Sequence, residues 1–240
     1  MKNGITLEIC IENGTRIDEL ISLGDKGIGK TAGINGIDTF DGIDRVELCD
    51  NMAAGGTSVS YGVAENVIAR CHKAGITVVS MVRPRGGDFV YDRHETEMMF
   101  RDIGIFKDLG SDGVVFGCLT ETGSLDTERI RRLLKAAGSM DAVFHMAFDH
   151  IRGGGGNSGP SKEQIQSLHW LAGEGFRRIL ARGSPDASSS AWDNREKIKT
   201  LVEEAAGRIG ILPGGGVTGE NYRELCACLG VSQVHGTRLP

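Results

Sequence analysis

The sequence predicts a single α/β domain of the (β/α)8, or TIM-type, barrel class over residues 1–240. Two observations lead to this prediction. Eight short apolar runs alternate with longer segments of helical period, and such alternation implies parallel strands joined by right-handed crossovers. The length of 240 residues also suits one barrel of this class. Eight repeats of the unit favour a closed barrel over an open, doubly wound sheet.

The predicted strands are short runs of apolar and β-branched residues, most of them bounded by glycine or polar residues. In chain order they cover residues 5–10, 45–49, 76–82, 113–117, 142–146, 178–181, 209–212 and 233–236. The predicted helices are the amphipathic segments between them, at residues 62–73, 95–109, 127–137, 162–172, 194–206 and 220–229.

Two irregular segments interrupt this alternation, and we predict both to be flexible loop insertions. Residues 24–42 are rich in Gly, Asp and Asn and lengthen the first crossover. Residues 153–160 contain four consecutive glycines after the fifth strand, where a barrel carries ligand-binding loops, so a mobile lid is the alternative there.

The sequence stops four residues after the eighth predicted strand. We therefore expect the final helix of the barrel to be short or missing. The wall that this helix would cover is then expected to be exposed, which favours a homodimer or a larger homo-oligomer.

Composition and charge exclude several classes of protein. The net charge is −5 and no stripe of Lys and Arg is present, so we expect no nucleic-acid partner and no anionic membrane surface as a partner. No apolar run approaches the roughly 20 residues that span a bilayer, and residues 1–10 lack the pattern of a signal peptide. Six cysteines are too few for a disulfide scaffold in a chain of this length. These features predict a soluble cytoplasmic protein with free thiols.

The first two strands carry the same pattern, LEIC at residues 7–10 and VELC at residues 46–49. Side chains alternate between the two faces of a strand, so Glu8 and Cys10 are expected to face the barrel interior. Glu47 and Cys49 are expected to do the same on the neighbouring strand. Because an unpaired buried carboxylate is costly, cationic or hydrogen-bonding partners are expected close to both glutamates.

Further ionisable residues lie at the ends of the third, fifth and eighth strands, which meet at the C-terminal mouth of a barrel. They are Arg83, Arg85, Asp88, His145, Asp149 and His235. Such a set indicates a working site at this mouth. The alternative is a polar plug that only closes the barrel interior.

Three glycines, Gly214, Gly215 and Gly216, follow the seventh strand. Loops after the seventh and eighth strands of such barrels often bind phosphate, and glycine-rich backbone can present N–H groups to an anion. A tight turn without a ligand explains the same three residues equally well.

Taken together, these motifs resemble the CutC family. The resemblance covers nearly the whole chain through LEIC, DRVELC, RPRGGDFVY, DGVVFG, FHMAFD, RIL, PGGGV and VHGT, in order and at suitable spacing. It implies a cytoplasmic (β/α)8 barrel that is often oligomeric and is associated with copper tolerance and Cu(I) binding.

The resemblance also implies that Cys10 and Cys49 are copper ligands, because the family's cysteines that end the first two strands have this proposed role. Cu(I) is a soft ion that prefers thiolates, and adjacent strands lie about 4.8 Å apart, so both thiols could reach one ion. We therefore predict a copper-homeostasis protein that binds Cu(I) inside the barrel. The alternative is that both cysteines are simply small residues packed in the core.

One departure from the family pattern changes the charge of the mouth. Met146 stands where the family usually has an arginine after the histidine of the fifth strand. Arg182, after the sixth strand, is hypothesised to restore the missing positive charge. An R182A substitution would test this through lost anion binding or lost stability.

The second predicted function is an enzyme that acts on a small anionic or phosphorylated substrate at the same mouth. Arg83 and Arg85 would clamp the anion, assisted by the backbone of the glycines after strand seven and by His235. Glu8 and Asp88 would orient the ligand or balance charge.

Catalysis by such an enzyme would need an acid or base that titrates near neutral pH. His145, with Asp149 or Glu47 nearby, is the candidate. No nucleophile motif, P-loop or dinucleotide fingerprint accompanies it, so the type of reaction stays open.

Overall fold

The computed structural model describes residues 4–25, 43–153 and 159–239. Its eight strands are β1 (Thr6–Glu12), β2 (Arg45–Cys49), β3 (Thr77–Met81), β4 (Gly113–Phe116), β5 (Asp141–Phe144), β6 (Arg178–Ala181), β7 (Gly210–Pro213) and β8 (Gln233–Gly236). Three of them, β2, β6 and β8, have the predicted bounds. The others differ by one or two residues at an end, as strand boundaries commonly do.

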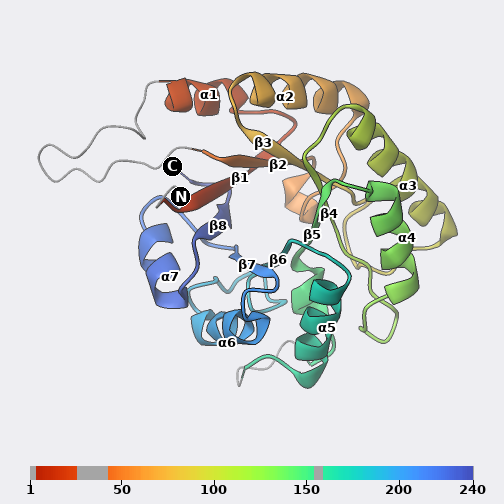
Figure 1. Cartoon of the computed structure of the whole chain (residues 1–240), viewed down its shortest axis with the longest axis vertical. Helices are drawn as coiled ribbons and strands as arrows, with labels where there is room; N and C mark the ends of the chain where they lie inside the picture. The colour runs from red at the N-terminus through yellow and green to blue at the C-terminus, as the bar shows by residue number, and fades with distance from the viewer. Residues whose placement is uncertain (1–3, 26–42, 154–158, 240) are drawn as a thin grey trace, which may run out of the picture.

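All eight strands are parallel and form one sheet in the order β7-β6-β5-β4-β3-β2-β1-β8. A further parallel bridge joins Gly214, directly after β7, to His235 in β8. This bridge connects the two ends of the sheet, so the sheet closes into the predicted barrel. Figure 1 shows the strands at the centre and the helices around them.

The helices surround the barrel in chain order. They are α1 (Ile17–Asp25), α2 (Tyr61–Lys73), α3 (Arg93–Asp108), α4 (Thr127–Ala137), α5 (Lys162–Gly173), α6 (Arg195–Ala205) and α7 (Tyr222–Leu229). Two 3-10 helices, η1 (Met52–Ala54) and η2 (Met146–His150), follow β2 and β5. No helix follows β8 within the described residues, as predicted.

Local sequence signals fix where several helices begin. The Asp92 side chain accepts a hydrogen bond from the backbone N–H of Glu95, and the Glu95 side chain accepts one from the Asp92 N–H. Ser161 and Gln164 form the same reciprocal arrangement before α5. These capping boxes satisfy N–H groups that the first helical turn leaves without partners.

The helix α1 is the one described α-helix that the sequence pattern did not predict. Residues 24 and 25 of the predicted insertion at 24–42 belong to it, whereas residues 26–42 lie outside the described residues. Most of the other predicted insertion, at residues 154–158, also lies outside them. Ile17 and Leu20 of α1 are buried against the barrel wall and explain why this short helix forms.

The barrel has two hydrophobic layers. The larger layer lies between strands and helices and includes Leu7 and Val46, which face outward as the alternation predicted. The smaller one fills the barrel interior with Cys10, Cys49, Val79, Met81, Val115 and Val143. The site described below therefore lies on a packed interior, and its floor is made of the side chains that end the strands.

The expectation of an exposed barrel wall beside β8 was wrong. Leu7 of β1 and Val234 of β8 both face outward there, and both are 0% exposed. Leu239, after β8, is also fully buried and belongs to the same hydrophobic cluster as Leu20 of α1. The segment after β8 and the flanking helix thus take part in covering the wall without a final helix.

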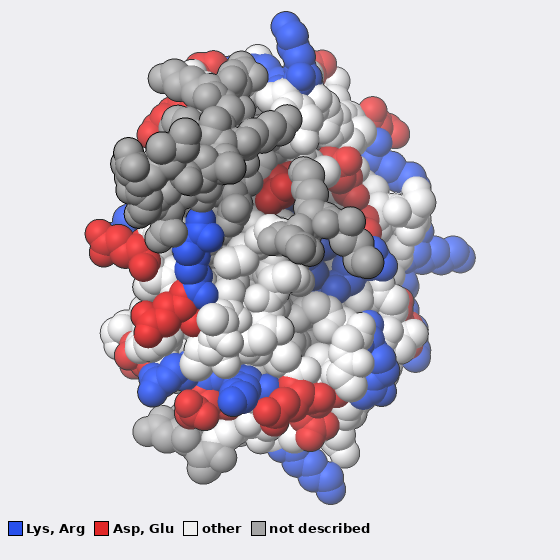
Figure 2. All heavy atoms as spheres, turned by 60° about the vertical axis from the view of Figure 1, so that its left-hand side comes forward, with Lys and Arg blue, Asp and Glu red and all other residues white. Residues whose placement is uncertain are grey.

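The described surface carries both signs of charge. On the face seen in Figure 2, Lys and Arg side chains lie interspersed with Asp and Glu. This agrees with the modest net charge of −5. Within the described part of the chain, every helix is too short or too polar to cross a bilayer.

Candidate functional site

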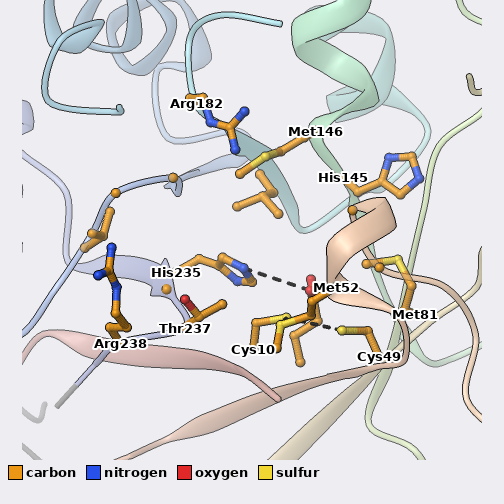
Figure 3. Close-up of a pocket in the computed structure, with 18 of the residues that line it drawn as sticks. Cys10, Cys49, Met52, Met81, His145, Met146, Arg182, His235, Thr237 and Arg238 are labelled. Carbon is orange, nitrogen blue, oxygen red and sulfur yellow. Dashed lines mark hydrogen bonds and ion pairs between the residues drawn. The ribbon is translucent and has the colours of Figure 1, made fainter. Parts of the chain in front are cut away.

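A pocket of about 280 Å³ opens at the carboxyl ends of the strands, where the sequence predicted the site. Its floor carries sulfur atoms and its walls carry two histidines and two arginines, as Figure 3 shows. The lining includes Cys10, Glu47, Cys49, Met52, Met81, Phe89, His145, Met146, Arg182, Gly215, Gly216, His235, Thr237 and Arg238.

The two cysteines that the sequence singled out lie together on the floor of the pocket. Their Sγ atoms are 3.4 Å apart, because Cys10 and Cys49 face inward from neighbouring strands. The thioether of Met52 lies 3.8 Å from the Sγ of Cys10. Gly56 has a φ of +86° and leaves room for Met81, whose methyl group would lie 3.3 Å from a Cβ at that position. The floor is therefore a cluster of soft donors that includes two methionines the sequence analysis missed.

A row of buried ionisable groups lies beside the thiols. Nδ1 of His235 lies 2.8 Å from Oε1 of Glu8, and Glu8 also forms an ion pair with Arg45. Nε2 of His235 lies 3.9 Å from Oε1 of Glu47, whose other carboxylate oxygen is buried without a hydrogen-bond partner. Both glutamates thus have the cationic neighbours that their burial requires.

Burial and charge shift the pKa values of this row in opposite directions. Burial alone would raise the pKa of Glu8, but the hydrogen bond with His235 and the charge of Arg45 lower it to about 2. Burial raises the pKa of Glu47. Burial would lower the pKa of His235, but the carboxylates of Glu47 and Glu8 raise it. The hydrogen bond with Cys49, burial and the charge of Glu47 all raise the pKa of the Cys10 thiol.

His145 lines the pocket but has a different environment. Its Nδ1 accepts a hydrogen bond of 3.2 Å from the backbone N–H of Ala147 at the start of η2, and its Nε2 is buried without a partner. Burial and the charge of Arg83 lower its pKa to about 3, so the ring is neutral at physiological pH.

Asp149 is not paired with His145 in the described structure. It is 1% exposed and accepts hydrogen bonds from the backbone N–H groups of Arg182, at 2.8 Å, and Gly183, at 2.9 Å. Burial raises its pKa to about 6 despite these two bonds. Asp149 therefore holds the loop after β6, and it does not line the pocket.

The structure does not place Arg83, Arg85 and Asp88 on the pocket. The guanidinium of Arg83 donates to the backbone carbonyls of Ala54, Gly56 and Gly87 at 2.8–3.0 Å and so fixes the loop around η1. Arg85 forms ion pairs with Asp88, at 3.0 Å, and with Glu95. The terminal nitrogens of Arg83 and the guanidinium of Arg85 are occupied by neighbouring backbone and carboxylates, while the Nε of Arg83 is buried without a partner.

The positive charges that do line the pocket belong to Arg182 and Arg238. Arg182 lies beside Met146 on one wall, and its Nε is buried without a partner. A Cβ at Gly215, whose φ is +94°, would lie 2.5 Å from that Nε, so the glycine permits the close approach. The placement agrees with the hypothesis that Arg182 supplies the charge that Met146 lacks. Arg238 was missed, because it lies beyond the last predicted strand and outside the recognised motifs.

The three glycines after β7 have different roles. Gly215 and Gly216 line the pocket at positive φ. Gly214 does not line it, and a Cβ at Gly214 would lie 2.6 Å from Leu180 and 3.2 Å from His235. The first glycine therefore permits close packing, and the next two present backbone to the pocket.

Comparisons with known proteins agree with this architecture. Residues 5–239 match the CutC family. A CutC family protein of Enterococcus faecalis is 40% identical over 233 residues, which cover 97% of this chain and 98% of that protein. The human copper homeostasis protein cutC homolog is 34% identical over 233 residues, which cover 97% of this chain and 73% of that protein.

A solved structure extends the comparison to the fold. The crystal structure of a CutC protein from Streptococcus agalactiae superposes with a TM-score of 0.82 at 42% identity. The match covers 98% of this chain and 99% of that one. The chain described here therefore belongs to the CutC family of copper homeostasis proteins.

Proposed function

We propose that the protein acts in copper homeostasis in the cytoplasm by binding Cu(I) between Cys10 and Cys49. The observation that carries the proposal is the 3.4 Å separation of the two Sγ atoms on the floor of a pocket. Two sulfur atoms at this separation need only a small rotation to bind one ion. The Sδ of Met52, 3.8 Å from Cys10, adds a third soft donor. Thiolates and thioethers are the ligands that select Cu(I) over harder ions.

Binding of Cu(I) at this pair is expected to release protons. The pKa of Cys10 is raised, so the thiol is protonated before metal arrives. A thiolate is the species that binds the ion, and the charge of Cu(I) replaces that of the lost proton. The apparent affinity should therefore increase as pH rises.

The test is an anaerobic titration of the full chain with Cu(I) against a chromophoric chelator. The parent is compared with a Cys10→Ser/Cys49→Ser double variant and with a Cys228→Ser control, which removes a half-buried thiol on α7 outside the pocket. We expect stoichiometric binding in the parent and in the control, and its loss in the double variant. Equal binding by all three proteins would refute the assignment.

The second candidate function is an enzyme that acts on a small anionic or phosphorylated substrate. It is supported by Arg182 and Arg238, which line the pocket beside the backbone of Gly215 and Gly216. Guanidinium groups and backbone N–H groups are common ligands for carboxylate and phosphate. In this function His145 is the candidate acid or base, and its lowered pKa makes it a proton acceptor of low basicity at neutral pH.

Binding of inorganic phosphate measured by calorimetry tests this second function. We expect Arg182→Ala to abolish phosphate binding and Arg101→Ala, an exposed arginine on α3, to leave it unchanged. Equal phosphate affinity in the parent and Arg182→Ala would contradict it. The homo-oligomer implied by the family resemblance stays a prediction, which light scattering on the purified chain tests directly.

A further inference from the structure

We propose that Cys10, Glu47 and His235 form a second metal site, for a divalent cation of zinc-like preference. The three side chains come from β1, β2 and β8, and each is at least nine-tenths buried. The site shares Cys10 with the Cu(I) pair but does not use Cys49. Binding of the divalent cation can therefore be tested separately from the proposed Cu(I) binding. A thiolate, a carboxylate and an imidazole are the donors that Zn²⁺ combines in proteins.

The distances between the donor atoms suit a single ion. One atom from each residue can be chosen so that all three lie within 4.8 Å of one another. The donors of a tetrahedral zinc site lie about 3–4 Å apart, since the metal–ligand bonds are about 2.0–2.3 Å long. Small rotations about the side-chain bonds, which move the donor atoms by about 1 Å, would bring them to the spacing of a zinc site.

The hydrogen bond between His235 and Glu8 prepares the imidazole as a ligand. Glu8 is held by Arg45, and its Oε1 accepts a hydrogen bond of 2.8 Å from Nδ1–H of His235. The other ring nitrogen, Nε2, faces Glu47, whose Oε1 lies 3.9 Å away, and a bound ion would take the place of its proton. Metal-binding histidines usually carry such a carboxylate on the second nitrogen, which fixes the tautomer and raises the basicity of the ligand.

Glu47 supplies an independent indication of a missing ligand. Its Oε2 is buried and has no hydrogen-bond partner, and the residue is 2% exposed. A buried carboxylate oxygen without a partner is unfavourable. Two negative charges, from the Cys10 thiolate and Glu47, would neutralise a divalent ion, while Glu8 stays balanced by Arg45.

The cation would remain accessible from solvent. All three residues line the pocket, so the fourth coordination position faces its open volume. Three protein ligands with one open position are typical of zinc sites that bind water or an exogenous anion. Arg182 and Arg238 line the same volume and would attract such an anion.

The two proposed sites can be separated experimentally, because a given substitution should weaken the binding of one ion and leave the binding of the other unchanged. The full chain is titrated with Zn²⁺ against a chromophoric chelator and, separately, with Cu(I). Cys49→Ser should keep the Zn²⁺ affinity of the parent and lose Cu(I). Glu47→Gln, which keeps the shape of the side chain, should weaken Zn²⁺ by at least about 100-fold and keep Cu(I). Glu8→Gln, which removes the partner of Nδ1, should weaken Zn²⁺ by about 10-fold or more.

A measurement on Co²⁺ keeps the proposal testable if a variant does not fold. The thiolate-to-Co²⁺ charge-transfer band of the parent should have the intensity of one bound thiolate and be unchanged in Cys49→Ser. A band of twice that intensity in the parent that halves in Cys49→Ser would place the divalent ion between the two thiols and overturn the proposal. Unchanged Zn²⁺ affinity in folded Glu47→Gln, or no stoichiometric Zn²⁺ binding by the parent, would overturn it as well.

Discussion

Replacing Asp149 with asparagine should change how the stability of the barrel depends on pH. The carboxylate is buried and its pKa is raised from 3.8 to about 6, so the folded protein binds a proton there more tightly than the unfolded chain. Stability contributed by this group therefore falls as pH rises through the interval between these two values. Asparagine cannot ionise, and the variant lacks this dependence.

The size of the effect follows from the shift. A difference of about two pKa units corresponds to about 3 kcal/mol between the fully protonated and fully ionised limits. Between about pH 4.5 and about pH 7.5, the accessible part is about 2 kcal/mol. The free energy of unfolding of Asp149→Asn minus that of the parent should thus rise by about 2 kcal/mol over this range. At either single pH the difference also contains the loss of one of the two backbone hydrogen bonds, about 1–3 kcal/mol, which cancels between the two measurements.

Urea unfolding of both proteins at the two pH values measures this quantity. Asp193→Asn is a suitable control, because Asp193 is an exposed aspartate whose pKa is lowered by hydrogen bonds from Ser190. Its contribution is lost only as pH falls below the ordinary value of 3.8, so the difference between Asp193→Asn and the parent should stay nearly constant over this range. A difference for Asp149→Asn that is constant or falls with rising pH would refute the link between burial and the raised pKa.

Three further substitutions test the packing around the site. Gly215→Ala places a Cβ within 2.5 Å of Arg182 at a φ of +94°, so thermal denaturation should show a loss of at least about 1 kcal/mol and phosphate binding should weaken. Glu8→Gln leaves the half-buried Arg45 with a neutral partner and should cost about 3 kcal/mol in urea unfolding near neutral pH. Because the pKa of Glu8 is lowered to about 2, its contribution is present above 4.5, and the cost should shrink as pH falls toward 2. Phe144→Ala removes a fully buried ring outside the site and should cost about 3–5 kcal/mol without changing metal affinity.

The period-2 alternation along β1 and β2 was sufficient to predict the centre of the site. It places Cys10 and Cys49 on the same face of adjacent strands, and the parallel register then brings them into contact. The alternation of strands and helices likewise predicted the closed barrel and all eight strand starts to within one residue of the observed ones. These features depend on local pattern, which a sequence displays directly.

Features that depend on loop conformation could not be predicted in this way. The sequence near Arg83 and Arg85 places two cations at the mouth but does not say that carbonyls and carboxylates occupy them. Met52 reaches Cys10 only because η1 folds over the end of β2, and an isolated methionine carries no spacing signal. The helix α1 is short and ends beside Gly24, which suggested a loop.

The seam between β1 and β8 has a consequence for biosynthesis. Glu8 and His235 are 227 positions apart in the chain and meet only when the last strand pairs with the first. A ribosome must therefore translate past β8, and the last strand must leave the exit tunnel, before His235 can reach its carboxylate partner. The two cysteines, by contrast, are both present once β2 has emerged, so a nascent chain carries exposed thiols long before the barrel can enclose them. The thiol pair can thus form before the rest of the barrel, whereas any site that includes His235 can form only in the finished protein.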